Sequence, residues 1–160
     1  MSFFRAADTG LVFWGPGDMY TFLATEQETD GAYFVMEGVV PPNGGPPPHI
    51  HHSQIETFYV VEGQLEITLG DQVYEAKAGD FVHVSKGTPH AFFNRSQTSA
   101  KVILTFVPAG DIQQFFEEAF ERATDRQASP PPITDAFIQR LLTTAKRYDI
   151  EFLPPPEQEP

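Results

Sequence analysis

Residues 43–63 read NGGPPPHIHHSQIETFYVVEG, a turn rich in glycine and proline, then a histidine pair and an apolar run. His49 and His51 are two positions apart, so on an extended backbone both imidazoles lie on one face. The β-branched and aromatic residues that follow Glu56 are typical of a strand. Imidazole is the commonest protein metal ligand, and a nearby carboxylate can complete such a site. This stretch therefore predicts the edge of a metal site built on strands.

A second stretch, residues 79–94, reads GDFVHVSKGTPHAFFN and contains His90 at the start of another candidate strand. All five histidines of the chain lie between positions 49 and 90. Three imidazoles and the carboxylate of Glu56, from three strands, would converge inside a barrel. Taken singly, each has an ordinary interpretation: a surface histidine pair, a solvated glutamate, a core or turn histidine.

Short strands separated by Gly, Pro, Asn and Asp are predicted on either side of these stretches. The candidates are 20–24, 32–40, 56–62, 64–69, 72–76, 81–84, 90–94 and 101–107. Many short strands at this spacing indicate an all-β sandwich or barrel rather than βαβ units.

The period of the apolar residues changes after Pro108. Ile112, Phe115, Phe116, Ala119, Phe120 and Ala123 recur at helical spacing. Asp111 and Gln114 resemble a capping box at the start of this helix. A second helix is expected from Thr134, after the proline run 130–132. We expect both helices to pack on the outside of the barrel or across a dimer.

Composition excludes several classes of function. The chain has 160 residues, the size of one domain, and a formal net charge of −12, which argues against nucleic acid and anionic membranes as partners. It has no cysteine, which excludes disulfides and thiolate chemistry. Its first twenty residues lack the pattern of a signal peptide, so the cytoplasm is the expected location.

The two stretches together resemble the two motifs of the cupin superfamily, in particular small single-domain cupins of the quercetin 2,3-dioxygenase-like kind. The first motif, G-x5-H-x-H-x3/4-E-x6-G, matches from Asn43 to Gly63, and the second, G-x5-P-x-G-x2-H-x3-N, matches from Gly79 to Asn94. Asn43 replaces a glycine and Ser85 a proline, but Asn tolerates a left-handed backbone and neither change removes a ligand.

The resemblance implies a cupin jelly-roll β-barrel (double-stranded β-helix) in residues 1–108, a C-terminal helical extension in 109–153, and a flexible tail in 154–160. It also implies four ligands for one divalent metal: His49, His51, Glu56 and His90. Three imidazoles and a carboxylate suit Fe, Mn, Ni, Co or Zn, and the ligand types do not choose among these. A homodimer is expected from the resemblance and from barrel edges that must be covered.

Strand alternation predicts the wall of a substrate cavity. If Glu56 and His90 point inward, Phe58, Val60, Phe92 and Asn94 do too, and Phe34 and Phe106 are further candidates. His52 and His83 alternate away from these faces and are expected at the surface or an interface.

The function implied by the resemblance is a metal-dependent dioxygenase acting on a small enolisable or phenolic, quercetin-like compound. Glu56 would then accept the substrate proton as general base. Two alternatives stay open: a non-oxidative isomerase, lyase or decarboxylase that uses the same metal, and a cupin that binds a small molecule without turnover. The fold does not choose, because one architecture hosts many functions.

Overall fold

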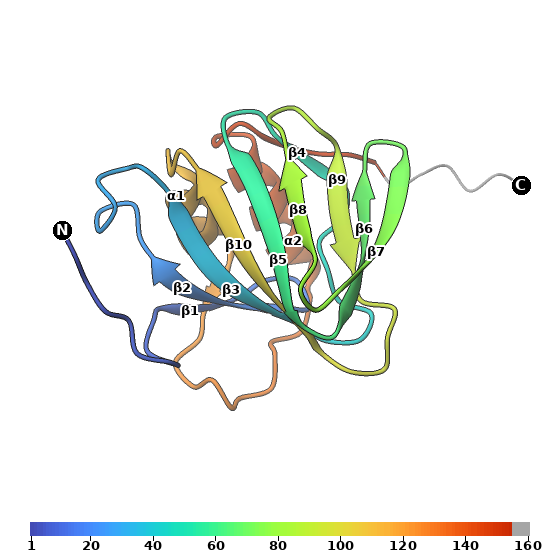
Figure 1. Cartoon of the computed structure of the whole chain (residues 1–160), viewed down its shortest axis with the longest axis horizontal. Helices are drawn as coiled ribbons and strands as arrows, with labels where there is room; N and C mark the ends of the chain where they lie inside the picture. The colour runs from blue at the N-terminus through green and yellow to red at the C-terminus, as the bar shows by residue number, and fades with distance from the viewer. Residues whose placement is uncertain (155–160) are drawn as a thin grey trace, which may run out of the picture.

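The computed structural model describes residues 1–154, so the predicted tail 154–160 lies outside the described residues except for Pro154. The elements in this part of the chain, drawn in Figure 1, are β1 (Val12–Trp14), β2 (Met19–Ala24), β3 (Phe34–Val40), β4 (His49–His51), β5 (Ile55–Glu62), β6 (Gln64–Leu69), β7 (Gln72–Lys77), β8 (Phe81–Val84), β9 (His90–Phe93), β10 (Ala100–Val107), α1 (Ile112–Ala119), β11 (Glu121–Arg122), α2 (Asp135–Ala145) and β12 (Ile150–Phe152).

The strands form two antiparallel sheets, which Figure 1 shows facing each other. One has the order β11-β1-β2-β3-β10-β5-β8 and the other β12-β4-β9-β6-β7. Strands far apart in sequence are neighbours in both sheets, as in a jelly roll. The predicted all-β jelly roll with two C-terminal helices is confirmed.

Alternating burial along the central strands builds the core between the sheets. In β3, Phe34, Met36 and Val40 are buried, and β10 pairs with it so that Leu104 lies opposite Met36 and Phe106 opposite Phe34. The Phe34 and Phe106 rings stack with centroids 6.0 Å apart. Every second residue of these strands is apolar, so these aromatic and aliphatic side chains lie together on the inner face of the sheet.

Three short strands, β1, β11 and β12, were not predicted, whereas β4 has the extended backbone that was expected for His49 and His51. The first helix ends at Ala119 rather than reaching Ala123, because Phe120 is extended and β11 pairs with β1, with Trp14 opposite Glu121. The capping-box prediction was wrong: Asp111 makes no side-chain cap, and the amide of Gln114 donates instead to Glu26 at 2.9 Å. Thr134 does cap α2, accepting from the Phe137 amide at 3.2 Å.

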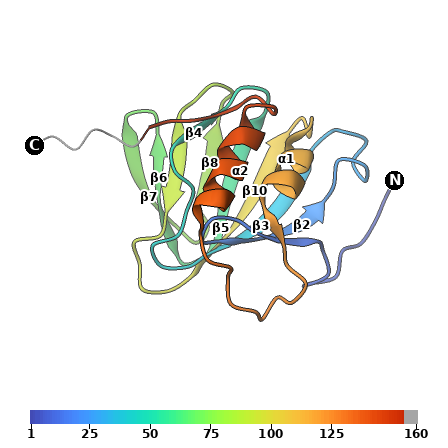
Figure 2. The same cartoon turned by 180° about the vertical axis from the view of Figure 1, so that it is seen from behind.

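The C-terminal segment covers one end of the sheets. Figure 2 shows α1 and α2 side by side against the strands, and β12 pairs with β4 with Phe152 opposite His49. Phe115, Phe116 and Leu141 from the two helices are buried in the common core. The domain boundary at residue 108 stays a prediction. Within residues 1–154, neither helix has the length and apolar run that crossing a membrane requires.

Asn94 joins the end of β3 to the loop before β10 through buried hydrogen bonds. Its fully buried amide group donates to the carbonyls of Val40 and Thr98, both at 2.8 Å, and its Oδ1 accepts from the Ser96 amide at 2.9 Å. We expect Asn94→Ala to lower the free energy of unfolding by about 1–3 kcal/mol, because the Val40 carbonyl loses this donor in the interior. Denaturant unfolding measures this, with the exposed Gln97→Ala as control. Equal stability of the two variants would contradict the assignment.

Candidate metal centre

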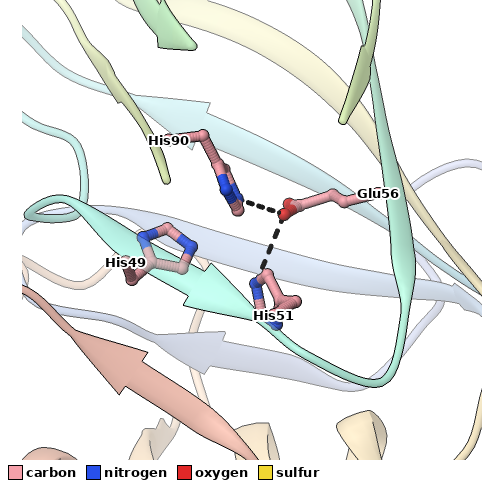
Figure 3. Close-up of side chains that lie close together, drawn as sticks. All are labelled: His49, His51, Glu56 and His90. Carbon is pink, nitrogen blue, oxygen red and sulfur yellow. Dashed lines mark hydrogen bonds and ion pairs between the residues drawn. The ribbon is translucent and has the colours of Figure 1, made fainter. Parts of the chain in front are cut away.

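Three strands of two sheets bring His49, His51, Glu56 and His90 together. β4 carries both His49 and His51, β5 carries Glu56, and His90 opens β9 directly opposite His49. Figure 3 shows the four side chains pointing toward one another. One possible ligand atom from each residue lies within 4.8 Å of the others, and all four residues are buried. The structure therefore gathers the predicted ligand set, and its role as a ligand set stays a prediction.

Hydrogen bonds to the main chain orient two of the imidazoles. His49 Nδ1 lies 2.9 Å from the Pro47 carbonyl and His90 Nδ1 lies 2.8 Å from the Thr88 carbonyl. A carbonyl only accepts, so in each ring Nδ1 carries the proton that is donated. The other nitrogen, Nε2, is then the one free to bind a metal, the arrangement in which a hydrogen bond to one ring nitrogen fixes the tautomer and leaves the other for the ion.

The carboxylate of Glu56 lies against two of these rings. Its Oε2 is 2.7 Å from Nε2 of His90 and 3.3 Å from Nε2 of His51, contacts dashed in Figure 3. Because Nδ1 of His90 already donates its proton, a neutral His90 would turn a lone pair toward a carboxylate oxygen. A cation between the two atoms, either a proton or a metal ion, removes that repulsion.

The electrostatics of the cluster suit metal binding. Burial, reinforced by the neighbouring rings of His90 and His51, lowers the pKa of His49 to about 3, so this imidazole is neutral at pH 7. Burial alone would raise the pKa of Glu56, but the charge and hydrogen bonds of His51 and His90 outweigh it and hold that pKa well below its usual range. Burial would lower the pKa of His90, yet the bond to Glu56 raises it.

These residues fit a divalent metal. The cluster offers three imidazole rings and one carboxylate, a mixed N/O set that first-row metals accept. Nδ1 of His51 is buried without a hydrogen-bond partner among the described residues, so the polar contact that orients this ring is the one between its Nε2 and Glu56. No thiolate is present anywhere in the sequence.

We expect the apparent metal affinity to rise with pH across neutrality. The raised pKa of His90 means that a proton between His90 and Glu56 must leave before a metal binds, and each released proton changes affinity about tenfold per pH unit. The affinity should therefore fall as the pH drops below that raised pKa. Calorimetric titration of Zn²⁺ or Mn²⁺ between about pH 5.5 and about pH 8 measures the slope. A flat profile would contradict proton displacement at His90.

A cavity of about 40 Å³ opens beside three of the four residues, His49, His51 and Glu56. It has room for an ion and a few waters, since one water needs about 10–15 Å³ on this measure. Its wall is mostly aromatic and aliphatic, and includes Phe92 and Phe106 of the predicted set. Phe34, Phe58, Val60 and Asn94 are buried but do not form part of this wall.

Sequence reasoning missed most of the wall. The C-terminal segment contributes Phe115, Phe116, Phe120, Leu141, Ile150 and Phe152, and the β1–β2 region contributes Pro16, Asp18 and Tyr20. The helical spacing of apolar residues after Pro108 predicted a buried helix face, but it did not predict that this face would cover the cavity. Asp18 carries only a weak signal, an acidic residue between a Gly-Pro-Gly turn and an apolar strand.

His52 and His83 lie away from the cavity wall. His52 is exposed and its Nε2 is 3.0 Å from a carboxylate oxygen of Glu151, while His83 is exposed next to Ser85. Both positions agree with strand alternation and make these residues matched controls for the buried histidines.

Residues 34–106 match the family model described as Cupin domain. Quercetin 2,3-dioxygenase from Bacillus subtilis is 31% identical over 98 residues, a match that covers 61% of this chain and 28% of that protein. The chain spans less than two thirds of the length of the curated relatives it matches.

Two solved structures illustrate the likeness of fold. KdgF from Halomonas sp. has a TM-score of 0.62 at 21% identity, covering 71% of this chain and 98% of that chain. The polyketide cyclase RemF from Streptomyces resistomycificus has a TM-score of 0.58 at 20% identity, covering 84% and 89%. Likeness at these identities shows the fold alone.

Proposed function

Since this chain is a small member of the cupin superfamily, we propose that it is a metal-dependent enzyme acting on a small enolisable or phenolic compound, with dioxygenation as its reaction. The observation that carries the proposal is the buried cluster of three imidazoles and one carboxylate at the side of an apolar cavity. The quercetin 2,3-dioxygenase relative from Bacillus subtilis supports the choice of reaction.

In the proposed reaction the cluster binds the metal and moves a proton, and the cavity wall excludes water. A bound divalent cation supplies Lewis acidity, which stabilises a substrate enolate or phenolate oxygen and lowers its pKa. His49, His51 and His90 would hold the cation through their ring nitrogens, and Glu56 would accept the substrate proton. The two imidazoles contact Oε2 of Glu56, which leaves Oε1 as the oxygen that would accept the substrate proton. The aromatic wall would keep bulk water away from the substrate enolate or phenolate while dioxygen reacts with it.

Metal analysis combined with oxygen uptake tests this proposal. The purified protein should carry about one divalent metal per chain and consume oxygen with at least one member of a panel of flavonols, diketones and catechols. A metal-loaded protein that consumes no oxygen with any of them would contradict the dioxygenase assignment.

A non-oxidative reaction on the same metal is the second candidate. The cavity of about 40 Å³ is too small for a flavonol unless side chains of its wall move, which favours a smaller enolisable compound that only isomerises or is cleaved. Anaerobic turnover separates the two, because a dioxygenase stops without oxygen and an isomerase or lyase continues. Binding without any turnover would identify the third possibility, a small-molecule-binding cupin.

The homodimer is also part of the proposal. Tyr59 of β5 and Phe81 of β8 are paired across the strands and are 47% and 63% exposed, beside the unpaired edge of β8. A second copy would shield this apolar pair and edge from water. Sedimentation should give a dimer at high micromolar concentration, and a monomer there would contradict it. The cytoplasmic location stays a prediction.

A further inference from the structure

A second buried carboxyl group lies on the wall of the same cavity. Asp18 follows the Gly15-Pro16-Gly17 turn between β1 and β2, is only 2% exposed, and has its Oδ1 buried without a hydrogen-bond partner among the described residues. Its Oδ2 accepts a hydrogen bond from the Tyr20 hydroxyl at 2.6 Å. A buried carboxyl oxygen without a hydrogen-bond partner is costly and uncommon, and such groups gather at functional sites.

The surroundings hold Asp18 in place. A Cβ on Gly15 would lie 2.4 Å from Asp18 Oδ1, so only glycine leaves room for the carboxyl at this position. The ring of Tyr20 stacks on Phe120 with centroids 5.6 Å apart, which ties the tyrosine to the C-terminal segment. The orientation of Asp18 is therefore fixed from two sides, as a proton-exchanging group requires.

The carboxyl group of Asp18 holds its proton more strongly than an ordinary aspartate does. Burial raises the pKa of Asp18 to about 7, although the hydrogen bond from Tyr20 lowers it. Burial, with the charges of Asp18 and Glu56, raises the pKa of Tyr20, which keeps its hydroxyl a donor. A buried carboxyl group that lies on a cavity wall with one unpartnered oxygen, and that keeps its proton near neutral pH, is suited to donate that proton in the cavity.

We propose that Asp18, oriented by Tyr20, is the general acid of this site and works with Glu56 as the base, an inference that rests on the proposed function. Glu56 takes a proton from a substrate C–H or O–H bond, whose electron pair stays on the substrate as an enolate or phenolate. Asp18 delivers the proton from Oδ1 to the substrate atom on which that negative charge collects later in the reaction. Solvent then returns the proton from Glu56 to Asp18, so the cycle balances.

The proposal narrows the substrate to a compound with two functional groups. One oxygen binds at the imidazole cluster, and a second oxygen or carbon accepts a proton at Asp18. The other titratable groups on the cavity wall are Tyr20 of β2, His49 and His51 of β4 and Glu56 of β5, and the wall from α1, α2 and β12 is apolar. Asp18 is thus the acid of the cavity that lies outside the metal cluster.

Asp18→Asn, Tyr20→Phe and the exposed control Asp71→Asn test the inference on metal-loaded protein with the active member of the substrate panel. Asp18→Asn should keep its metal, lower kcat about 100-fold or more, and lose the alkaline limb that wild type shows near pH 7. Tyr20→Phe should move that limb to higher pH, because the lost hydrogen bond had lowered the pKa of Asp18. Asp71→Asn should match wild type.

A carboxyl titration supplies a measurement that does not depend on activity. In protein labelled with ¹³C at the aspartate carboxyl carbon, one resonance should titrate near pH 7 and be missing from Asp18→Asn. Its absence from wild type, or an unchanged kcat and pH profile in an active Asp18→Asn protein, would overturn the acid role and leave the proposed function standing. A wild type that turns over no substrate on the panel would instead overturn the proposed function, and the acid role with it.

Discussion

The double variant His49→Ala, His51→Ala should lose its metal, falling from about one ion per chain to a small fraction of that. Both imidazoles come from the three-residue strand β4, and their removal leaves only Glu56 and His90 of the four candidate ligands. Two protein ligands in place of four bind a divalent ion too weakly to compete with water and buffer. Elemental analysis of the purified protein after dialysis measures the stoichiometry.

The outward histidines provide the control for that experiment. His52→Ala and His83→Ala remove the same number of imidazoles from exposed positions and should leave the metal content unchanged. Circular dichroism guards against loss of the fold, and His49→Gln, which preserves most of the side-chain volume, gives a milder variant. Retained stoichiometry in the folded double variant would refute the ligand assignment.

The place of the candidate ligands was predictable from two short stretches of sequence and their resemblance to the cupin motifs. His49 and His51 alternate on one strand, so both imidazoles lie on one face. The choice of Glu56 and His90 as their partners came from the resemblance, and the structure brings the four side chains together. The turn before them was predictable as well, since Asn43 has the left-handed φ of 63° that asparagine accepts in place of glycine. Such features need a short piece of chain and no knowledge of the remainder.

The cavity was not predictable, because it depends on how distant segments close over the site. Strand alternation correctly predicted that Phe58 and Val60 point inward, but it did not predict that the cavity ends before it reaches them. Phe116 was classed with an outer helical layer and Phe152 was not assigned, yet both line the cavity. Phe152 lies beside His49 because β12 pairs with β4. Asp18 is fixed by Gly15 and Tyr20 in a turn whose sequence indicates only a turn.

Glu56→Gln should reduce turnover far more than it weakens substrate binding. Glutamine keeps the shape of the side chain and a carbonyl oxygen that can still bind a metal, but it does not accept a proton at neutral pH. Loss of a general base costs about 100- to 10,000-fold in rate, so kcat should fall in that range while the substrate Kd changes by less than about tenfold. Steady-state kinetics, equilibrium binding and metal analysis of the same preparation separate these quantities.

Glu62→Gln is the matched control, because Glu62 ends the same strand β5 in an exposed position and should behave as wild type. The comparison with Asp18→Asn then separates the two carboxyl groups. A base and an acid that act in one reaction each lower kcat when removed, but they act on opposite limbs of the pH profile: loss of the base removes the acidic limb and loss of the acid the alkaline one. If Glu56→Gln instead loses metal, substrate binding and turnover to the same degree, Glu56 serves only to hold the ion. The proton from the substrate must then leave by another group, and Asp18, whose pKa lies near 7, would be the remaining carboxyl on the wall of the cavity.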